Sequence, residues 1–409
     1  MTDKPMAGVR ILEVAQFTFV PAAGAILADW GAEVVKIEHS SRGDAARGQT
    51  NIGSIDLAAG SFRPIFQHPN RGKRSVGLDL AHPAAKEILY DLARRSDVFL
   101  TNFLPDALSR LEIDVEHIRA VNPSIVYARG SGYGARGPDA GKPAFDATAF
   151  WARGGSSFGV TPPGSDRPLY MPAGAYGDSM GGITVAAGIA GALYARATTG
   201  EGSVVDVSLL ATGAWAAGLS VNLSLLSGDP MPPNSLPEPG PARNPIYGAF
   251  RTADDRWIQI SMLQAGRYWA DVCRHIDRPE LIEDERFDTL PKLMANAPAA
   301  NAILVEAIAA HPLAHWQKRF ETLEGAWAIY QNSLEVAQDP QLRANGYIAP
   351  VTDVEGNERE LLANPVQFDE TPPALVRAPE FAEHTDDVLR ELGIDEERLI
   401  ELKLAEAIT

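Results

Sequence analysis

The feature that most constrains the fold is the alternation of short apolar runs with helical segments in the first third of the chain. Such runs predict strands, and the amphipathic or small-residue segments between them predict helices. We expect strands at residues 9–14, 33–38, 75–80, 97–101 and 124–128, and helices at 21–30, 83–95 and 106–111. This alternation is typical of a parallel sheet covered by helices, so the fold class is predicted as α/β. Ligands of such sheets bind beyond the carboxyl ends of the strands, so the loops that follow these strands should border one site.

The rest of the chain predicts a second, smaller domain. A helix from residue 178, a strand at 204–207 and a further helix to 226 are followed by seven prolines in residues 227–245, which indicate a linker. Beyond the linker, a hairpin pattern gives way to helices until about residue 324. We therefore expect a large domain from residues 1–226 with 340–409 and a small α+β domain from 246–335.

Composition limits the possible partners. The 53 acidic and 36 basic residues give a net charge of -17, which argues against nucleic acid or an anionic membrane as partner. The longest apolar run, 186–195, looks too short and too mixed to span a bilayer, and residues 1–14 lack the pattern of a secretory signal. The single cysteine, Cys273, lies in a helical pattern as an inert thiol and fits a cytoplasmic location.

One carboxylate stands at the predicted start of a helix. Residues 176–182 read YGDSMGG and run into an apolar segment. The partial positive charge of a helix N-terminus favours an ionised Asp178, and the glycines would let another molecule approach the backbone. Such a carboxylate could attack an activated acyl group without a partner base. A simple helix cap is the other interpretation, and the motif alone leaves both open.

Three further motifs could form binding sites. Residues 132–137, GYGARG, match the dinucleotide fingerprint after a strand, but a loop follows them instead of a helix, which disfavours a nicotinamide cofactor. His311 and His315 have the spacing of metal ligands, yet Pro312 and the lack of a third ligand argue against a metal. The basic residues of 70–75, NRGKRS, form either a solvated loop or, as we favour in so acidic a chain, a phosphate site.

Together these segments resemble the class III CoA-transferase family, which includes formyl-CoA, carnitine and bile-acid CoA-transferases. The similarity keeps its order across nearly the whole chain, in residues 8–38, 70–80, 102–111, 127–138, 177–182, 199–208 and 384–392. The resemblance implies a large domain with a Rossmann-like parallel sheet, a smaller domain and an interlocked homodimer. It implies acyl-CoA and a carboxylic acid as substrates, with coenzyme A as the carrier and no metal.

The resemblance also assigns roles to residues. It implies that Asp178 attacks the donor thioester to give a mixed anhydride, and that the released CoA then forms an aspartyl-CoA thioester. By position, it implies that CoA is bound by Phe17, Thr18, Phe19, His39, Lys73, Arg74, Asn102, Phe103, Arg110, Lys142 and Leu209. His39 replaces a frequent arginine and Leu209 a common methionine. Thr18 stands where formyl-CoA transferases carry glutamine, which disfavours oxalate or formate as substrate.

The nearest rival activity on this fold is α-methylacyl-CoA racemisation. Racemases use a histidine in a Gly-His-Asp triplet, which here reads Ala144-Phe145-Asp146. Because phenylalanine cannot carry a proton, the sequence favours a transferase. Outside the family, a nicotinamide-dependent oxidoreductase and a non-catalytic CoA-binding protein stay as alternatives. The substrates are not specified, although aromatic residues expected near the site favour an apolar or bulky acid: Phe19, Phe145, Phe150 and Trp151.

Overall fold

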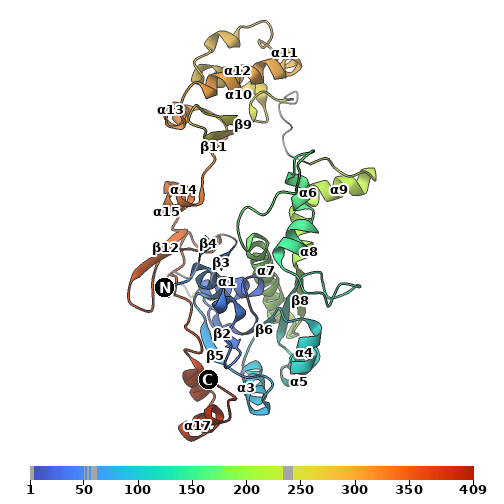
Figure 1. Ribbon diagram of the computed structural model, residues 1–409, viewed down its shortest axis with the longest axis vertical. Coiled ribbons are helices and arrows are strands. Elements are labelled where there is room, and N and C mark those ends of the chain that lie inside the picture. Colours follow the sequence, from blue (N-terminus) through green and yellow to red (C-terminus); the bar gives the residue numbers. More distant parts are fainter. Residues whose placement is uncertain (1–3, 50, 53–54, 57–61, 234–242) are drawn as a thin grey trace. The chain divides into compact units, whose positions relative to one another are not determined.

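The computed structural model describes residues 4–49, 51–52, 55–56, 62–233 and 243–409. The chain divides into two compact units, which Figure 1 shows. Unit 1 is formed by Met1–Ser235 with Pro340–Thr409, and unit 2 by Leu236–Asp339. Part of the Pro-rich segment for which a linker was predicted, residues 234–242, lies outside the described residues.

Unit 1 is built around a six-stranded sheet with the strand order β5-β2-β1-β6-β7-β8. All of its neighbouring strands pair in parallel. The strands are β1 (Arg10–Val14), β2 (Glu33–Glu38), β5 (Arg74–Gly77), β6 (Val98–Thr101), β7 (Val126–Ser131) and β8 (Val204–Ser208). The chain builds the sheet outward from β1 on one side and then from β6 on the other. Ligands bind where the order reverses in this way, between β1 and β6. The predicted α/β fold with a parallel sheet is confirmed.

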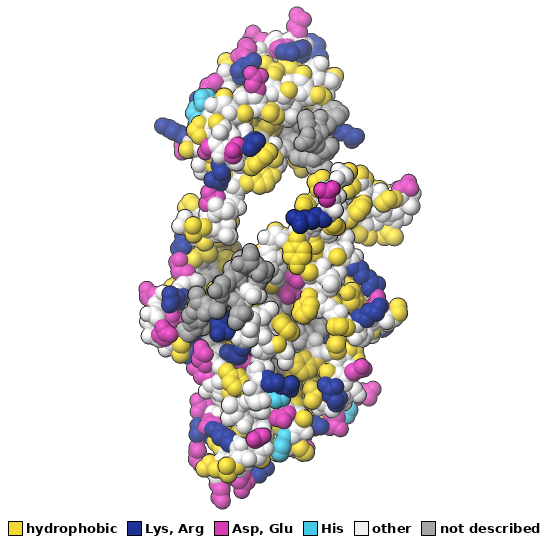
Figure 2. Space-filling view, in the orientation of Figure 1, with side chains coloured by type: hydrophobic (Ala, Val, Ile, Leu, Met, Phe, Trp, Pro, Cys, Tyr) yellow, Lys and Arg dark blue, Asp and Glu magenta, His cyan; other side chains and the backbone are white. Residues whose placement is uncertain are grey.

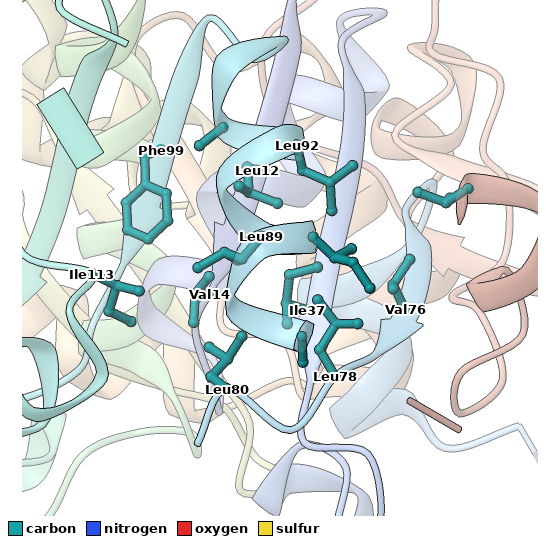
Figure 3. Packing of buried hydrophobic residues seen from close by; sticks show 14 of the residues in the cluster. Leu12, Val14, Ile37, Val76, Leu78, Leu80, Leu89, Leu92, Phe99 and Ile113 are labelled. Atoms are coloured by element: carbon teal, nitrogen blue, oxygen red, sulfur yellow. The ribbon is translucent and has the colours of Figure 1, made fainter. Parts of the chain in front are cut away.

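Helices cover both faces of the sheet because successive strand residues point to opposite sides. Leu12 packs beneath the amphipathic helix α3 (Pro83–Arg94), against Leu89 and Leu92 (Figure 3). Its neighbour Ile11 joins the other core, which contains α1 (Phe19–Asp29) and α7 (Tyr176–Thr199). The C-terminal helices α16 (Thr385–Glu391) and α17 (Glu396–Leu404) complete the layer that holds α3.

Short elements connect these layers. The sequence did not predict α2 (Pro64–Asn70) or α5 (Val115–Val121). The other elements of unit 1 are η1 (Ala45–Gly48), β3 (Asn51–Ile52), β4 (Ile55–Asp56), α4 (Pro105–Leu111), η2 (Ala147–Ala152), α6 (Ser156–Val160), α8 (Leu209–Ala216), α9 (Gly218–Ser227), α15 (Pro340–Ala344), β12 (Ile348–Thr352) and β13 (Glu358–Leu362).

The glycines of the 176–182 motif serve packing inside the protein. A Cβ atom on Gly182 would stand 2.6 Å from the Cβ atom of Ala22 in α1, and one on Gly181 would stand 2.3 Å from the Phe19 ring. Only glycine lets α7 lie this close to α1. The expectation that these glycines admit another molecule to the backbone was therefore wrong.

Helix α7 is longer than the apolar run seen in the sequence. With 24 residues and a mean hydropathy of 1.2, it is long and apolar enough to cross a membrane by length and composition alone. Two bent helix pairs, α8 with α9 and Ala297–Ala309 with Leu313–Thr322, would pass the same test if each formed one span. The expectation that the apolar segment within α7 is too short to span a bilayer was therefore wrong as regards length. In unit 1 the buried face of α7 packs in the core with α1.

Unit 2 contains an antiparallel sheet with the order β11-β10-β9. The predicted hairpin is present as β9 (Tyr247–Arg251) and β10 (Trp257–Ser261). The remaining elements are α10 (Ala265–His275), η3 (Pro279–Ile282), α11 (Leu290–Ala295), α12 (Ala297–Ala309), α13 (Leu313–Arg319), η4 (Phe320–Thr322), β11 (Trp327–Ile329) and α14 (Ser333–Gln338). Cys273 of α10 is fully buried, and burial raises the pKa of its thiol to about 12, so it is inert as expected.

Candidate active site

Asp178 lies in the first turn of α7, and its carboxylate does not cap the helix. The residue before the helix is Ala175, and the backbone N–H of Gly177 donates to Oδ2 of Asp146 at 3.1 Å. Among the described residues, no hydrogen-bond donor reaches the Asp178 carboxylate, which instead lines a cavity of about 260 Å³. The capping interpretation is therefore wrong for Asp178, and Asp146 supplies an acceptor at this helix end.

The protonation of Asp178 differs from the expectation. Burial, and secondly the negative charge of Asp146, raise the pKa of Asp178 to about 7. The helix N-terminus therefore does not keep this carboxyl group fully ionised near neutral pH. Both forms are populated there, which is typical of groups that take part in chemistry.

The cavity brings together most of the predicted site residues. It is lined by Asp178 and by Phe17, Phe19, Asn102, Phe103, Lys142 and Leu209. These residues follow the carboxyl ends of β1, β6, β7 and β8, as the sheet topology requires. The side chain of Asn102 joins two of the loops, since its Oδ1 accepts from the Gln16 N–H at 3.0 Å and its Nδ2 donates to the Gln16 carbonyl at 2.7 Å.

A second cavity of about 540 Å³ lies beside the first, and Phe103 lines both. Its wall carries His39, Arg42 and Arg110. Neither arginine has an ion-pair partner among the described residues, so both side chains could pair with an anion that enters this cavity. Sequence reasoning missed Arg42, although a cation shortly after the strand at 33–38 was a signal for it.

Three predicted CoA ligands lie outside the two cavities. The Lys73 side chain is fully buried, and its Nζ donates to both carboxylate oxygens of Glu13, at 2.7 and 2.8 Å. Arg74 begins β5 and pairs with Glu33 and Glu391, at the amino ends of the strands, opposite the cavities. Thr18 is buried before α1 and lines neither cavity. The basic run at 70–75 is thus used for internal ion pairs.

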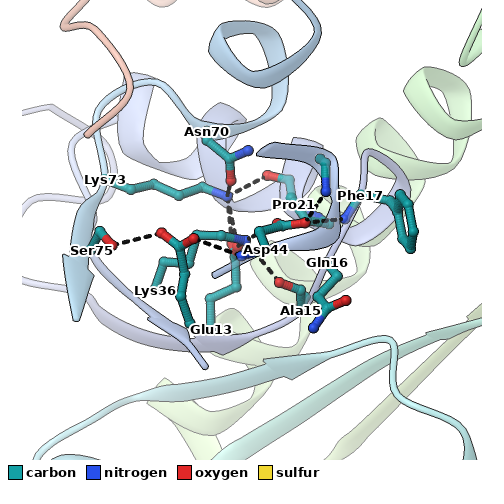
Figure 4. Close-up of polar contacts among 12 residues, drawn as sticks. Glu13, Ala15, Gln16, Phe17, Pro21, Lys36, Asp44, Asn70, Lys73 and Ser75 are labelled. Atoms are coloured by element: carbon teal, nitrogen blue, oxygen red, sulfur yellow. Dashed lines mark hydrogen bonds and ion pairs between the residues drawn. The ribbon is translucent and has the colours of Figure 1, made fainter. Parts of the chain in front are cut away.

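Buried ion pairs lie beside the loop after β1, the loop that brings Phe17 to the cavity (Figure 4). Lys36 pairs with Glu13 at 3.1 Å and with Asp44 at 2.8 Å, and all three side chains are fully buried. Burial alone would lower the pKa of Lys36, but Asp44 and Glu13 outweigh it and the pKa is raised. Burial lowers the pKa of Lys73, and the carboxylate of Glu13 limits the fall.

The same ion pairs fix the loop after β1. Lys36 Nζ donates to the Ala15 carbonyl at 2.8 Å, and Oδ1 of Asp44 accepts from the Phe17 N–H at 3.1 Å. Phe17 has a φ of 63°, which is unusual for a bulky residue. Such a backbone conformation persists only where the surrounding structure holds it in place. Gly24 makes room for the cluster, because a Cβ atom there would stand 2.1 Å from Oε2 of Glu13.

Comparison with known proteins decides the family. Residues 6–385 match CoA-transferase family III. The chain belongs to this family. It is 33% identical to a cinnamoyl-CoA:phenyllactate CoA-transferase of Clostridium sporogenes, over 97% of this chain and 95% of that protein. It is 31% identical to an (R)-2-hydroxy-4-methylpentanoate CoA-transferase of Clostridioides difficile, over 97% and 98%.

Solved structures agree with this assignment. A CAIB/BAIF family protein from Brucella suis superposes with a TM-score of 0.79 at 26% identity, covering 96% of this chain and 100% of that one. As a member of family III the chain is an enzyme of the transferase class, and its substrates are CoA thioesters. The predicted family and enzyme class are confirmed.

Proposed function

We propose that this family III enzyme is an acyl-CoA:carboxylic acid CoA-transferase in which Asp178 carries the CoA as an aspartyl thioester. One observation supports this most: a carboxylate without a hydrogen-bond donor among the described residues lines a cavity that shares Phe103 with a cation-lined cavity. Arg42, Arg110 and His39 are suited to the phosphates of CoA. A CoA molecule bound there would place its thioester in the neighbouring cavity, which shares Phe103 and holds Asp178.

The proposed steps exchange one activated acyl group for another. An Asp178 oxygen attacks the thioester carbonyl, the C–S bond breaks, and a mixed anhydride and CoA thiolate form. The thiolate attacks the Asp178 carbonyl carbon, which releases the donor acid and leaves the aspartyl-CoA thioester. The acceptor carboxylate attacks this thioester, giving a new anhydride and thiolate. Attack of the thiolate on the acceptor acyl carbon then regenerates the Asp178 carboxylate.

The acid substrates are proposed to be apolar. The names of two relatives contain cinnamoyl-CoA with phenyllactate and (R)-2-hydroxy-4-methylpentanoate. In this chain the cavity around Asp178 has apolar walls that include Phe17, Phe19, Phe145 and Leu209. A panel of acyl-CoA donors and free acids, assayed for CoA exchange, tests the proposal. Exchange in no combination of donor and acid would contradict it.

The racemase alternative has less support. Phe145, at the position of the racemase histidine, lines the cavity with Asp178 and offers no proton. An oxidoreductase is likewise disfavoured, because Gly134 and Gly137 of the fingerprint-like motif lie between β7 and η2 in a loop and open no helix that could hold a pyrophosphate. Within the described residues no group of His, Cys, Asp and Glu is arranged for a metal.

The rate should depend on pH through Asp178. Because its carboxylate form is the nucleophile, kcat/KM is expected to rise with pH through an apparent pKa near 7. Asp146→Asn removes a neighbouring charge that raises this pKa, and its amide oxygen can still accept from Gly177. The variant should therefore reach its plateau at lower pH, whereas Asp91→Asn on the surface should not. A pH profile that Asp146→Asn leaves unchanged would contradict this coupling.

Arg42 and Arg110, which have no ion-pair partner among the described residues, should bind the phosphates of CoA. Arg42→Ala and Arg110→Ala are each expected to weaken CoA binding by about 1.5–3 kcal/mol, the usual contribution of a charge-assisted hydrogen bond. Calorimetric titration with CoA and with 3′-dephospho-CoA shows which phosphate each arginine contacts. Arg74→Ala is the matched control and should bind CoA as the wild type does. An unchanged affinity for CoA in both Arg42→Ala and Arg110→Ala would show that CoA binds elsewhere.

A homodimer is proposed to cover the apolar surface of α9. This helix has no buried residue, and Leu225 and Leu226 are 78% and 86% exposed. Figure 2 shows hydrophobic side chains gathered over this helix. Exposed patches of this kind mark interaction sites. Sedimentation should give twice the mass of one chain, and a monomer would contradict the proposal. The cytoplasm stays the predicted location.

A further inference from the structure

Two aromatic side chains form one wall of the cavity that holds Asp178. Phe17 and Phe145 pack edge to face, with ring centroids 5.6 Å apart and ring planes at 90°. Both line the cavity. Phe145 is 59% exposed, so much of its ring is left for contact with a ligand. An apolar ligand that covers this ring removes hydrophobic surface from water, which favours binding.

The Phe17 ring is held in place before any ligand binds. Its backbone N–H is bound by Asp44, and its left-handed φ of 63° turns the ring away from the buried ion pairs (Figure 4). Phe17 also packs against the small cluster of Ala46, Phe66 and Ala378. A wall that is fixed in this way loses little conformational freedom when a ligand binds.

Phe145 is tied to the turn that carries the nucleophile. The next residue, Asp146, accepts from the Gly177 N–H, one residue before Asp178. Thr148 holds the backbone of Phe145, because its hydroxyl donates to the Phe145 carbonyl at 2.9 Å. These bonds hold the backbone of Phe145 beside the turn that carries Asp178.

We propose that Phe17 and Phe145 are the residues that determine acid specificity, and that they select acids with an aromatic ring. A third ring placed in their corner meets one ring by its face and the other by its edge, the two arrangements that aromatic groups prefer. An aliphatic chain fills the corner without these contacts. This inference rests on the proposed transferase function and names the class of acid that the site takes.

The test compares 3-phenylpropanoate with acetate as acceptors for one acyl-CoA donor. The wild type should prefer the aromatic acid. Phe145→Ala and Phe17→Ala should each lower the ratio of kcat/KM for 3-phenylpropanoate to kcat/KM for acetate by about 10- to 100-fold, mainly through the KM for 3-phenylpropanoate. Phe145→Leu keeps apolar bulk without a ring and should lose most of the preference for the aromatic acid over an aliphatic acid of similar size.

Phe158→Ala is the matched control, because Phe158 is 60% exposed and lines a separate apolar cavity. It should leave both values unchanged. A wild type that transfers CoA but prefers acetate, or variants that lose both acids equally, would overturn the specificity role and leave the transferase function standing. Failure of the wild type to transfer CoA to any acid would overturn the proposed function and this inference with it.

Discussion

Asp178→Asn is expected to lower kcat for CoA transfer by about 10⁴-fold or more, the usual cost of removing a catalytic nucleophile. Asparagine keeps the size and polarity of the side chain but cannot form the anhydride or the thioester. Steady-state transfer at saturating donor and acceptor measures the loss, and calorimetric titration should show CoA binding close to that of the wild type. A variant that retains a tenth of the wild-type rate would exclude Asp178 as nucleophile.

The same variant should fold at least as stably as the wild type. Because the pKa of Asp178 is raised to about 7 in the folded state, the folded protein binds this proton more tightly than the unfolded chain. Its contribution to stability is thus present at low pH and is lost as pH rises to about 7. Above that pH Asp178→Asn removes an unfavourable buried charge, so the free energy of unfolding should rise. An unstable Asp178→Asn would show that the carboxylate has a structural role.

Lys36→Met should produce the largest loss of stability. It leaves Asp44 without its ion-pair partner in a fully buried position, and breaking such a pair costs about 3–5 kcal/mol. Urea unfolding followed by circular dichroism measures the difference. Arg74→Ala, which breaks more exposed ion pairs, is the control and should cost at most about 1 kcal/mol.

Equal losses of unfolding free energy in the two variants would mean that the buried ion pairs of Lys36 stabilise the fold no more than the exposed pairs of Arg74. Lys36→Met should also release the loop that carries Phe17, since Lys36 donates to the Ala15 carbonyl. If the variant still folds at low temperature, its preference between acids should therefore weaken along with its stability.

The sheet could be predicted because its signals are local. Residues 33–38, EVVKIE, contain three β-branched residues and are followed by the polar segment 39–44, and the structure has β2 over Glu33–Glu38. Strand boundaries are less local: the sequence predicts a strand through residue 80, yet β5 ends at Gly77. Beyond it, Leu78 forms only an isolated bridge with Ile408, and Leu78 and Leu80 pack into the core. The short helix α2 was missed because Pro69 within it masks the helical pattern.

The site was predicted in part for a similar reason. Residues that directly follow strands, such as Asn102 and Phe103, could be placed because parallel strands end at one edge. The sequence does not show which cation pairs with a buried carboxylate: it predicts Lys73 as a phosphate ligand, yet Lys73 pairs with Glu13. The influence of Asp146 on Asp178 depends on a tertiary contact and carries no local signal.

Trapping of the aspartyl intermediate tests the central claim most directly. The wild type is incubated with an acyl-CoA donor and hydroxylamine, digested, and examined by mass spectrometry. The account predicts a hydroxamate on Asp178 that requires the acyl-CoA and is absent from Asp178→Asn. A protein that turns over acyl-CoA under these conditions with Asp178 unmodified, or with the hydroxamate on another carboxylate, would contradict it.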